Sequence, residues 1–261
     1  MSLLDVEHVH LKIGGLNILD DVSFAVGDGE FFAVIGPNGA GKTSLLNVLC
    51  RVYSATDGDV TFDGRSLLTQ RRDDLAGLGI ARTFQNLALF EHMDVLDNVI
   101  LGRHNRMRSG LLSGAWWVGR ARREEIRGRE ECWPLIELMD LTDYVGEPIT
   151  DLPYGIKKRI ELARALAVQP KLLLLDEPAA GMNDEETADL GDWILLAKKE
   201  LGLTVVMIEH DMGLVQRLAD RALVLDFGHV LTVESPREAI ADPRVIEAYL
   251  GVSSIDGEDA S

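Results

Sequence analysis

Short apolar segments recur towards both ends of the chain, and their patterns predict strands. Some alternate apolar and polar residues, as a strand does when one of its faces is covered, and others are continuously apolar, as in a sheet covered on both faces. Helical patterns follow several of these segments, the clearest at about 42–50 and from about residue 184. Strands that are followed by helices indicate an α/β fold. The predicted strands are 3–13, 22–26, 31–35, 172–175, 205–208 and 222–225.

The middle of the chain, about residues 87–165, lacks strand patterns and is dominated by helical ones. Residues 121–133 predict a helix that Pro134 interrupts, and residues 155–167 predict another. We therefore expect one α/β domain with an inserted helical subdomain. The expected division is a core at 1–86 and 166–250, a helical subdomain at 87–165 and a disordered acidic tail at 251–261.

Composition narrows the class of protein. The chain has 261 residues, of which 46% are hydrophobic, and this is enough for a large core. Its formal net charge of −17 repels nucleic-acid phosphates, so we expect no nucleic-acid partner. The two cysteines, Cys50 and Cys132, lack metal-site spacing. No apolar run approaches the ~20 residues that span a bilayer, and the first strand carries acidic residues, so we expect a cytosolic protein that reaches a membrane only through partners.

A glycine-rich segment after the strand at 31–35 fits the pattern GxxxxGK[ST]. Such a loop joins a strand to a helix, and its backbone N–H groups converge on phosphate oxygens. Lys42 would reach the β- and γ-phosphates of a nucleotide, and the Thr43 hydroxyl would bind Mg²⁺. The predicted nucleotide-binding residues are Gly36, Pro37, Asn38, Gly39, Ala40, Gly41, Lys42 and Thr43, with Ser44 directly after them.

Polar side chains at other strand ends could complete an ATP site. Asp176 and Glu177 follow the apolar strand 172–175, at the strand end where α/β sheets bind ligands. Asp176 would hold Mg²⁺, and Glu177 would act as the general base on the attacking water. His210 could donate to the γ-phosphate, and Gln85 could contact Mg²⁺ or the water. Either of these last two residues, taken alone, also fits an ordinary packed or surface side chain.

The order of these segments resembles the ABC ATPase family over residues 3–250. The phosphate loop comes first, followed by Gln85, the segment Leu152-Pro153-Tyr154-Gly155, the acidic strand end and His210. The resemblance implies a RecA-like P-loop NTPase core with antiparallel β elements and an inserted helical subdomain. It also implies ATP and Mg²⁺ as cofactors. Two such subunits would hold each ATP against the other subunit's signature segment, which here includes Tyr154 and Gly155.

Five segments are similar to the ATPase subunits of branched-chain amino acid importers. They are GIARTFQN, LPYGIKKRIELARAL, DEPAAGMN, IEHDM and VIEAYLG. This resemblance implies a second ATP-binding subunit, identical or different, two transmembrane permease subunits and an extracytoplasmic solute-binding protein. The chain would then lie at the cytoplasmic face of the cell membrane. The alternatives are the ATPase of a lipid or lipopolysaccharide exporter and a soluble ABC ATPase outside transport.

Three segments depart from the usual family pattern. The signature normally begins Leu-Ser-Gly-Gly-Gln, whereas Pro153 and Ile156 here remove the Ser hydroxyl and the Gln amide. Ile13 stands where many relatives place an aromatic residue against adenine, so we expect weaker base stacking. Asn183 replaces a usual Asp and keeps a hydrogen-bonding side chain without the charge.

Residues 103–131 have a charge opposite in sign to that of the whole chain. Between residues 103 and 129 there are eight Arg and two acidic residues, with an apolar cluster that includes Trp116 and Trp117. Because Arg and Trp are frequent at binding hot spots, one interpretation is a docking surface for the permeases. The other is a solvated helix whose aromatic side chains are buried.

Overall fold

A computed structural model describes residues 2–83, 89–103 and 117–255, and in the last range it describes the side chains of residues 126–250. The chain forms two compact units. The first unit comprises residues 1–72, 174–178 and 202–261, and the second comprises residues 73–173 and 179–201. Gln85 and Trp116 lie outside the described residues, as does the side chain of Trp117.

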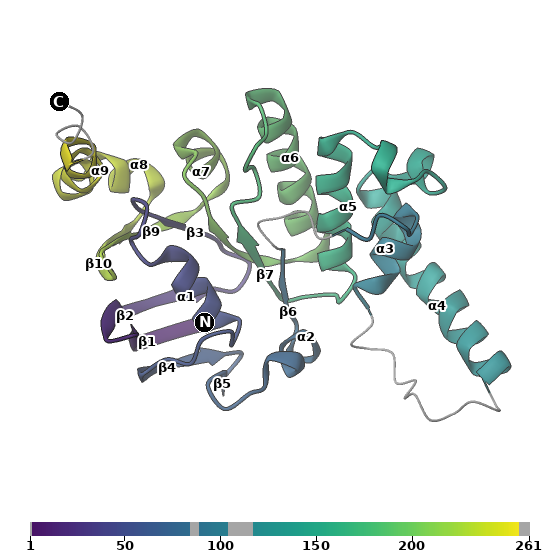
Figure 1. Ribbon diagram of the computed structural model, residues 1–261, viewed down its shortest axis with the longest axis horizontal. Coiled ribbons are helices and arrows are strands. Elements are labelled where there is room, and N and C mark those ends of the chain that lie inside the picture. The colour runs from purple at the N-terminus through teal and green to yellow at the C-terminus, as the bar shows by residue number, and fades with distance from the viewer. Residues whose placement is uncertain (1, 84–88, 104–116, 256–261) are drawn as a thin grey trace. The chain divides into compact units, whose positions relative to one another are not determined.

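Two sheets organise the chain (Figure 1). The antiparallel sheet has the strand order β2-β1-β4-β5 and lies in the first unit. The other sheet has the order β10-β9-β3-β8-β7-β6, and within it β3 runs parallel to both β8 and β9. The strands are β1 Ser2–Ile13, β2 Leu16–Gly27, β3 Phe31–Ile35, β4 Asp57–Phe62, β5 Arg65–Ser66, β6 Ile80–Arg82, β7 Leu172–Asp176, β8 Thr204–Ile208, β9 Arg221–Asp226 and β10 His229–Glu234.

The burial of the strands follows their sequence patterns. Strands β3, β7 and β8 are buried along their whole length, as continuous apolar runs predicted. Strand β2 alternates buried and exposed positions, and its Phe24 ring stacks on Phe32 with 5.3 Å between the ring centroids. Asp63 and Gly64 turn the chain from β4 into β5 with φ angles of 48° and 71°, the positive values that a tight hairpin turn requires.

The α-helices described in the first unit are α1 Lys42–Leu49, α7 Met212–Leu218, α8 Pro236–Ala241 and α9 Pro243–Ile255. The Asp211 side chain caps α7 by accepting from Leu214 N–H at 2.9 Å. Of the tail predicted at 251–261, residues 251–255 belong to α9, and residues 256–261 lie outside the described residues.

The second unit contains β6 and the remaining helices. These are α2 Leu75–Leu78, α3 Val95–Leu101, α4 Trp117–Leu138, α5 Tyr154–Leu166 and α6 Asp184–Leu201. Helix α6 was expected in the core and instead groups with this unit. A capping box begins this helix, since Asn183 Oδ1 accepts from Glu186 N–H at 3.0 Å and the Glu186 carboxylate accepts from Asn183 N–H at 3.1 Å.

The predicted interruption at Pro134 is wrong, because α4 continues through this residue to Leu138. A proline inside a helix removes one hydrogen bond and costs about 3 kcal/mol. Cys132 and Ile136, which flank the proline, and Met139, which follows the helix, are all fully buried. Burial of a large apolar side chain contributes roughly 1.5–3 kcal/mol, so the packed face of this helix outweighs the missing bond.

Within residues 2–83, 89–103 and 117–255, no helix combines the length and the hydrophobicity that are needed to cross a bilayer.

Candidate functional site

The phosphate loop leaves the end of β3 and enters α1 in the first unit. Gly36 has a φ of 147°, and a Cβ atom at this position would lie only 2.1 Å from the Leu225 carbonyl oxygen on β9. Gly41 has a φ of 102° at the N-cap of α1, and no side chain caps this helix. The first backbone N–H groups of α1 can therefore bind an anion, which the helix dipole also favours.

The Lys42 side chain lies over the same loop. Its ammonium donates to the carbonyl oxygens of Gly36 at 2.7 Å and Pro37 at 2.9 Å, and the residue is 6% exposed. Burial lowers the pKa of this ammonium from its usual value, and the negative charge of Glu177 opposes the shift. The geometry therefore holds a cation against a loop whose backbone is suited to phosphate.

Two neighbouring strand ends bring Glu177 and His210 together. Glu177 follows β7 and His210 follows β8, the next strand in the sheet. The Glu177 N–H donates to Ile208 O at 2.9 Å, and His210 Nε2 lies 3.1 Å from Glu177 Oε2. The Glu177 side chain is 14% exposed and the His210 side chain is 49% exposed. A carboxylate in this position can orient a proton-bearing group and accept its proton.

Glu177 has an unusual backbone conformation. Its φ is 48°, in the left-handed region that is rare for residues other than glycine, asparagine and aspartate. Such a conformation costs of order 1–3 kcal/mol and persists only where surrounding contacts enforce it. Here the hydrogen bond to Ile208 is one such contact. Because β7 ends at Asp176, the side chain of Glu177 does not follow the alternation of the strand.

The donor set fits a Mg²⁺ ion that is shared with a nucleotide. Thr43 offers a hydroxyl in the first turn of α1, and Asp176 offers a carboxylate on a residue that is 2% exposed. Both are oxygen donors, and Mg²⁺ usually takes one or two protein ligands together with substrate phosphates and water. In the part of the chain that the structure describes, no group of three or more His, Cys, Asp or Glu side chains could hold a metal alone.

The predicted site residues are divided between the two units. Lys42, Glu177 and His210 lie in the first unit, and so does Ile13, which ends β1 and is 42% exposed. Tyr154 begins α5 in the second unit, where its hydroxyl donates to the Ala180 carbonyl oxygen at 3.1 Å. The neighbouring Gly155 follows in the first turn of that helix.

Tyr249 on α9 is a residue near the phosphate loop that the sequence reasoning missed. Its hydroxyl is buried. Burial raises the pKa of this hydroxyl, and the nearby Gly36 backbone partly offsets the rise. The sequence signal for this packing was the spacing of Val245 and Tyr249, which are four residues apart and so lie on one face of α9. Val245 on this face is buried.

A family model described as ABC transporter matches residues 19–180. The chain belongs to the ABC transporter family. It is therefore a nucleotide-binding ATPase with the expected RecA-like P-loop core.

Three similar proteins place the chain within this family. The high-affinity branched-chain amino acid transport ATP-binding protein LivG of Salmonella typhimurium is 36% identical over 249 residues, with 95% of this chain and 98% of LivG covered. The corresponding protein BraF of Pseudomonas aeruginosa is 35% identical over the same shares of both chains. The ADP conformation of the ATP-binding cassette MJ1267 superposes with a TM-score of 0.84 at 30% identity, covering 96% of this chain and 99% of that one.

Proposed function

We propose that this chain is the ATP-hydrolysing subunit that energises an importer of branched-chain or related amino acids. The likeness to LivG and BraF along almost the whole of each chain supports the cargo class. The pairing of Glu177 with His210 beside the phosphate loop supports hydrolysis rather than nucleotide binding alone.

Residues of the first unit carry most of the hydrolysis reaction. The loop N–H groups and Lys42 bind the phosphates, and Glu177 accepts a proton from the attacking water. His210 keeps the Glu177 carboxylate in place and donates towards the γ-phosphate. Thr43 and Asp176 would hold Mg²⁺, which neutralises charge on the phosphates when it is bound. Ile13 provides an apolar contact for the base, and Gln85 is proposed to position the water or the ion.

The same proposal includes the other subunits of the importer. A second ATP-binding subunit, identical or different, completes each site with a signature segment, to which this chain contributes Tyr154 and Gly155. Pro153 lacks an N–H, so the contribution of this segment comes from the backbone at the start of α5. Two permease subunits and an extracytoplasmic solute-binding protein complete the importer, and they hold this chain at the cytoplasmic face of the membrane.

The test is to reconstitute the chain with the permeases that co-purify with it and with their solute-binding protein. We expect Mg²⁺-dependent ATP hydrolysis and ATP-dependent uptake of L-leucine, L-isoleucine or L-valine. Lys42→Ala should abolish both, because it removes the cation that meets the phosphates. Hydrolysis without uptake of any branched-chain amino acid would contradict the cargo, whereas absence of hydrolysis would contradict the assigned chemistry.

A further inference from the structure

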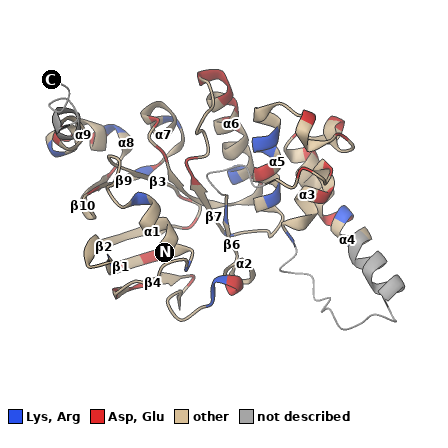
Figure 2. Ribbon diagram, viewed as in Figure 1, with Lys and Arg blue, Asp and Glu red and all other residues tan. Residues whose placement is uncertain are grey.

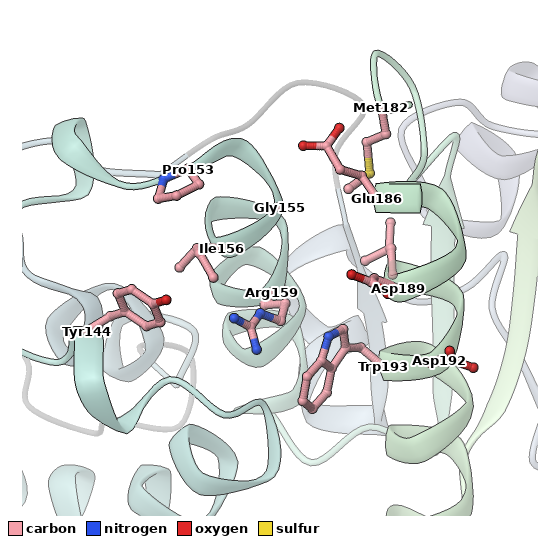
Figure 3. A pocket seen from close by; sticks show the side chains of 11 residues that line it. Tyr144, Pro153, Gly155, Ile156, Arg159, Met182, Glu186, Asp189, Asp192 and Trp193 are labelled. Atoms are coloured by element: carbon pink, nitrogen blue, oxygen red, sulfur yellow. The ribbon is translucent and has the colours of Figure 1, made fainter. Parts of the chain in front are cut away.

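A cavity of about 510 Å³ lies between α5 and α6, entirely within the second unit (Figure 3). Small-molecule sites are commonly concave, about 300–1,000 Å³ in volume, and combine apolar walls with a few convergent polar groups. This cavity has that composition, since aromatic and aliphatic side chains share its lining with an arginine and carboxylates. The proposed hydrolysis reaction uses only Pro153 and Gly155 of its lining, and leaves the remaining side chains without a role.

Helix α6 supplies an aromatic and acidic wall. Glu186, Asp189 and Trp193 follow one another at intervals of three and four residues, which places them on the same face of the helix. The Asp189 side chain is exposed and has no hydrogen-bond or ion-pair partner among the residues the structure describes. Acidic residues also form the first turn of this helix, as Figure 2 shows. The wall therefore favours a cationic group.

Helix α5 supplies an apolar side chain and a buried cation. Ile156 and Arg159 lie three residues apart on the face of α5 that lines the cavity. The Arg159 guanidinium lies 4.8 Å from the centroid of the Trp193 ring, and the side chain is only 11% exposed. This stacking fixes the orientation of a planar group that is suited to carboxylates.

The hydrogen bonds of Arg159 leave part of its guanidinium for a ligand. Its Nη1 donates to the Met139 carbonyl oxygen at 3.1 Å and to the carbonyl oxygen of Asp140 at 3.4 Å, and it forms an ion pair with the exposed Asp140 carboxylate at 3.4 Å. All the hydrogen bonds described for this side chain use Nη1, and a guanidinium has further N–H groups on Nε and Nη2. Figure 3 shows the guanidinium inside the cavity, with the Tyr144 hydroxyl turned towards the same space.

We propose that this cavity binds an α-amino acid with an apolar side chain. The Arg159 guanidinium would donate to the carboxylate of the ligand. The Asp189 carboxylate, with help from Glu186, would accept from its ammonium group. The side chain of the ligand would pack against Ile156 and the Tyr144 ring. A zwitterion with an apolar tail matches all three features at once, whereas a simple anion, cation or hydrocarbon matches one of them.

Binding would reach the signature segment, because Pro153 and Gly155 at the start of α5 line the same cavity. The site thus gives the ATPase subunit a means of sensing amino acid in the cytosol. We expect occupancy to lower ATP hydrolysis in the assembled transporter, so that import slows when the cargo has accumulated. This regulatory meaning rests on the proposed import function, whereas the binding site itself rests on the geometry of the second unit.

Calorimetric titration of the purified full chain tests the site without requiring transport or hydrolysis. L-Leucine should bind, and the two analogues that each lack one charged group, 4-methylpentanoate and 3-methylbutylamine, should bind about tenfold more weakly or worse. Asp189→Asn should weaken L-leucine binding by roughly tenfold. Asp184→Asn, on the same helix but outside the cavity, should leave binding unchanged.

The outcomes separate this proposal from the importer function. No binding up to about 10 mM L-leucine, or equal binding by the parent and Asp189→Asn, would overturn the site. Arg159→Gln gives a second test, with its melting temperature measured first because Arg159 also bonds to the chain near Met139. If the site binds L-leucine but the transporter carries another solute, the importer assignment fails and the site stands. If the transporter takes up branched-chain amino acids but the chain does not bind L-leucine, the importer assignment stands and the proposed site fails.

Discussion

Glu177→Gln separates ATP binding from ATP hydrolysis, because the backbone rather than the side chain places residue 177. Its N–H donates to the Ile208 carbonyl oxygen at 2.9 Å, a bond that the substitution leaves intact. Glutamine has nearly the same shape as glutamate but cannot act as a base at neutral pH. A positioned general base contributes about 10²–10⁴ in rate, so kcat should fall by this factor, equivalent to roughly 3–5.5 kcal/mol in the activation barrier.

The ion pair between Glu177 and His210 adds little to this magnitude. The two side chains are 3.1 Å apart, but half of the His210 side chain is exposed, and exposed pairs are typically worth up to about 1 kcal/mol. The stability of the first unit should therefore change by no more than this amount. ATP affinity should remain close to that of the parent, since Lys42 and the loop N–H groups are unaltered.

The assay is phosphate release by the reconstituted transporter, with nucleotide binding measured on the same protein. Glu234→Gln, at the exposed end of β10, is the matched control and should hydrolyse ATP at the parent rate. Parental hydrolysis by Glu177→Gln would mean that another group takes the proton. Equal losses of kcat and ATP affinity would mean that the residue serves binding, and the assignment of Glu177 as base would be withdrawn.

Two further substitutions test the base contact and the packing of the second unit. With Ile13 at the end of β1, we expect GTP to compete within about tenfold of ATP, and Ile13→Tyr should strengthen binding of both nucleotides in fluorescence titrations, since stacking is worth roughly 1–3 kcal/mol per base. An unchanged affinity would show that Ile13 does not meet the base. Asn98→Asp should lower the free energy of unfolding by about 2–4 kcal/mol, because its amide donates to three backbone carbonyls within residues 90–94. Thermal melting checks this, and Asp97→Asn, whose side chain is half exposed, should have a much smaller effect.

Local patterns predicted the elements whose determinants are local. The continuous apolar runs gave β3, β7 and β8, because burial on both faces leaves a direct trace in the sequence. The start of α6 was predicted at about residue 184, and the capping box of Asn183 and Glu186 that forms it uses only four consecutive residues. The phosphate loop was found for the same reason.

Features that depend on distant packing were not predictable in this way. Helix α4 continues through Pro134 because the burial of its other side chains compensates for the hydrogen bond that the proline removes. The sequence does not say which face of the helix is buried. Asn98 is fully buried and organises residues 90–94, but an isolated asparagine is normally a surface or turn residue. The approach of Tyr249 to the phosphate loop likewise depends on where α9 packs.

The two adjacent carboxylates, Asp176 and Glu177, illustrate how a single backbone turn divides chemical roles. Asp176 is the last residue of β7 and is 2% exposed, an environment in which a carboxylate favours a bound cation over water. Had the strand continued, Glu177 would have pointed to the opposite face of the sheet. Its positive φ instead ends the strand and sets its side chain beside His210 at the end of β8. The strained turn thus keeps both carboxylates at the edge of the sheet that carries the phosphate loop, with one suited to hold an ion and the other suited to take a proton.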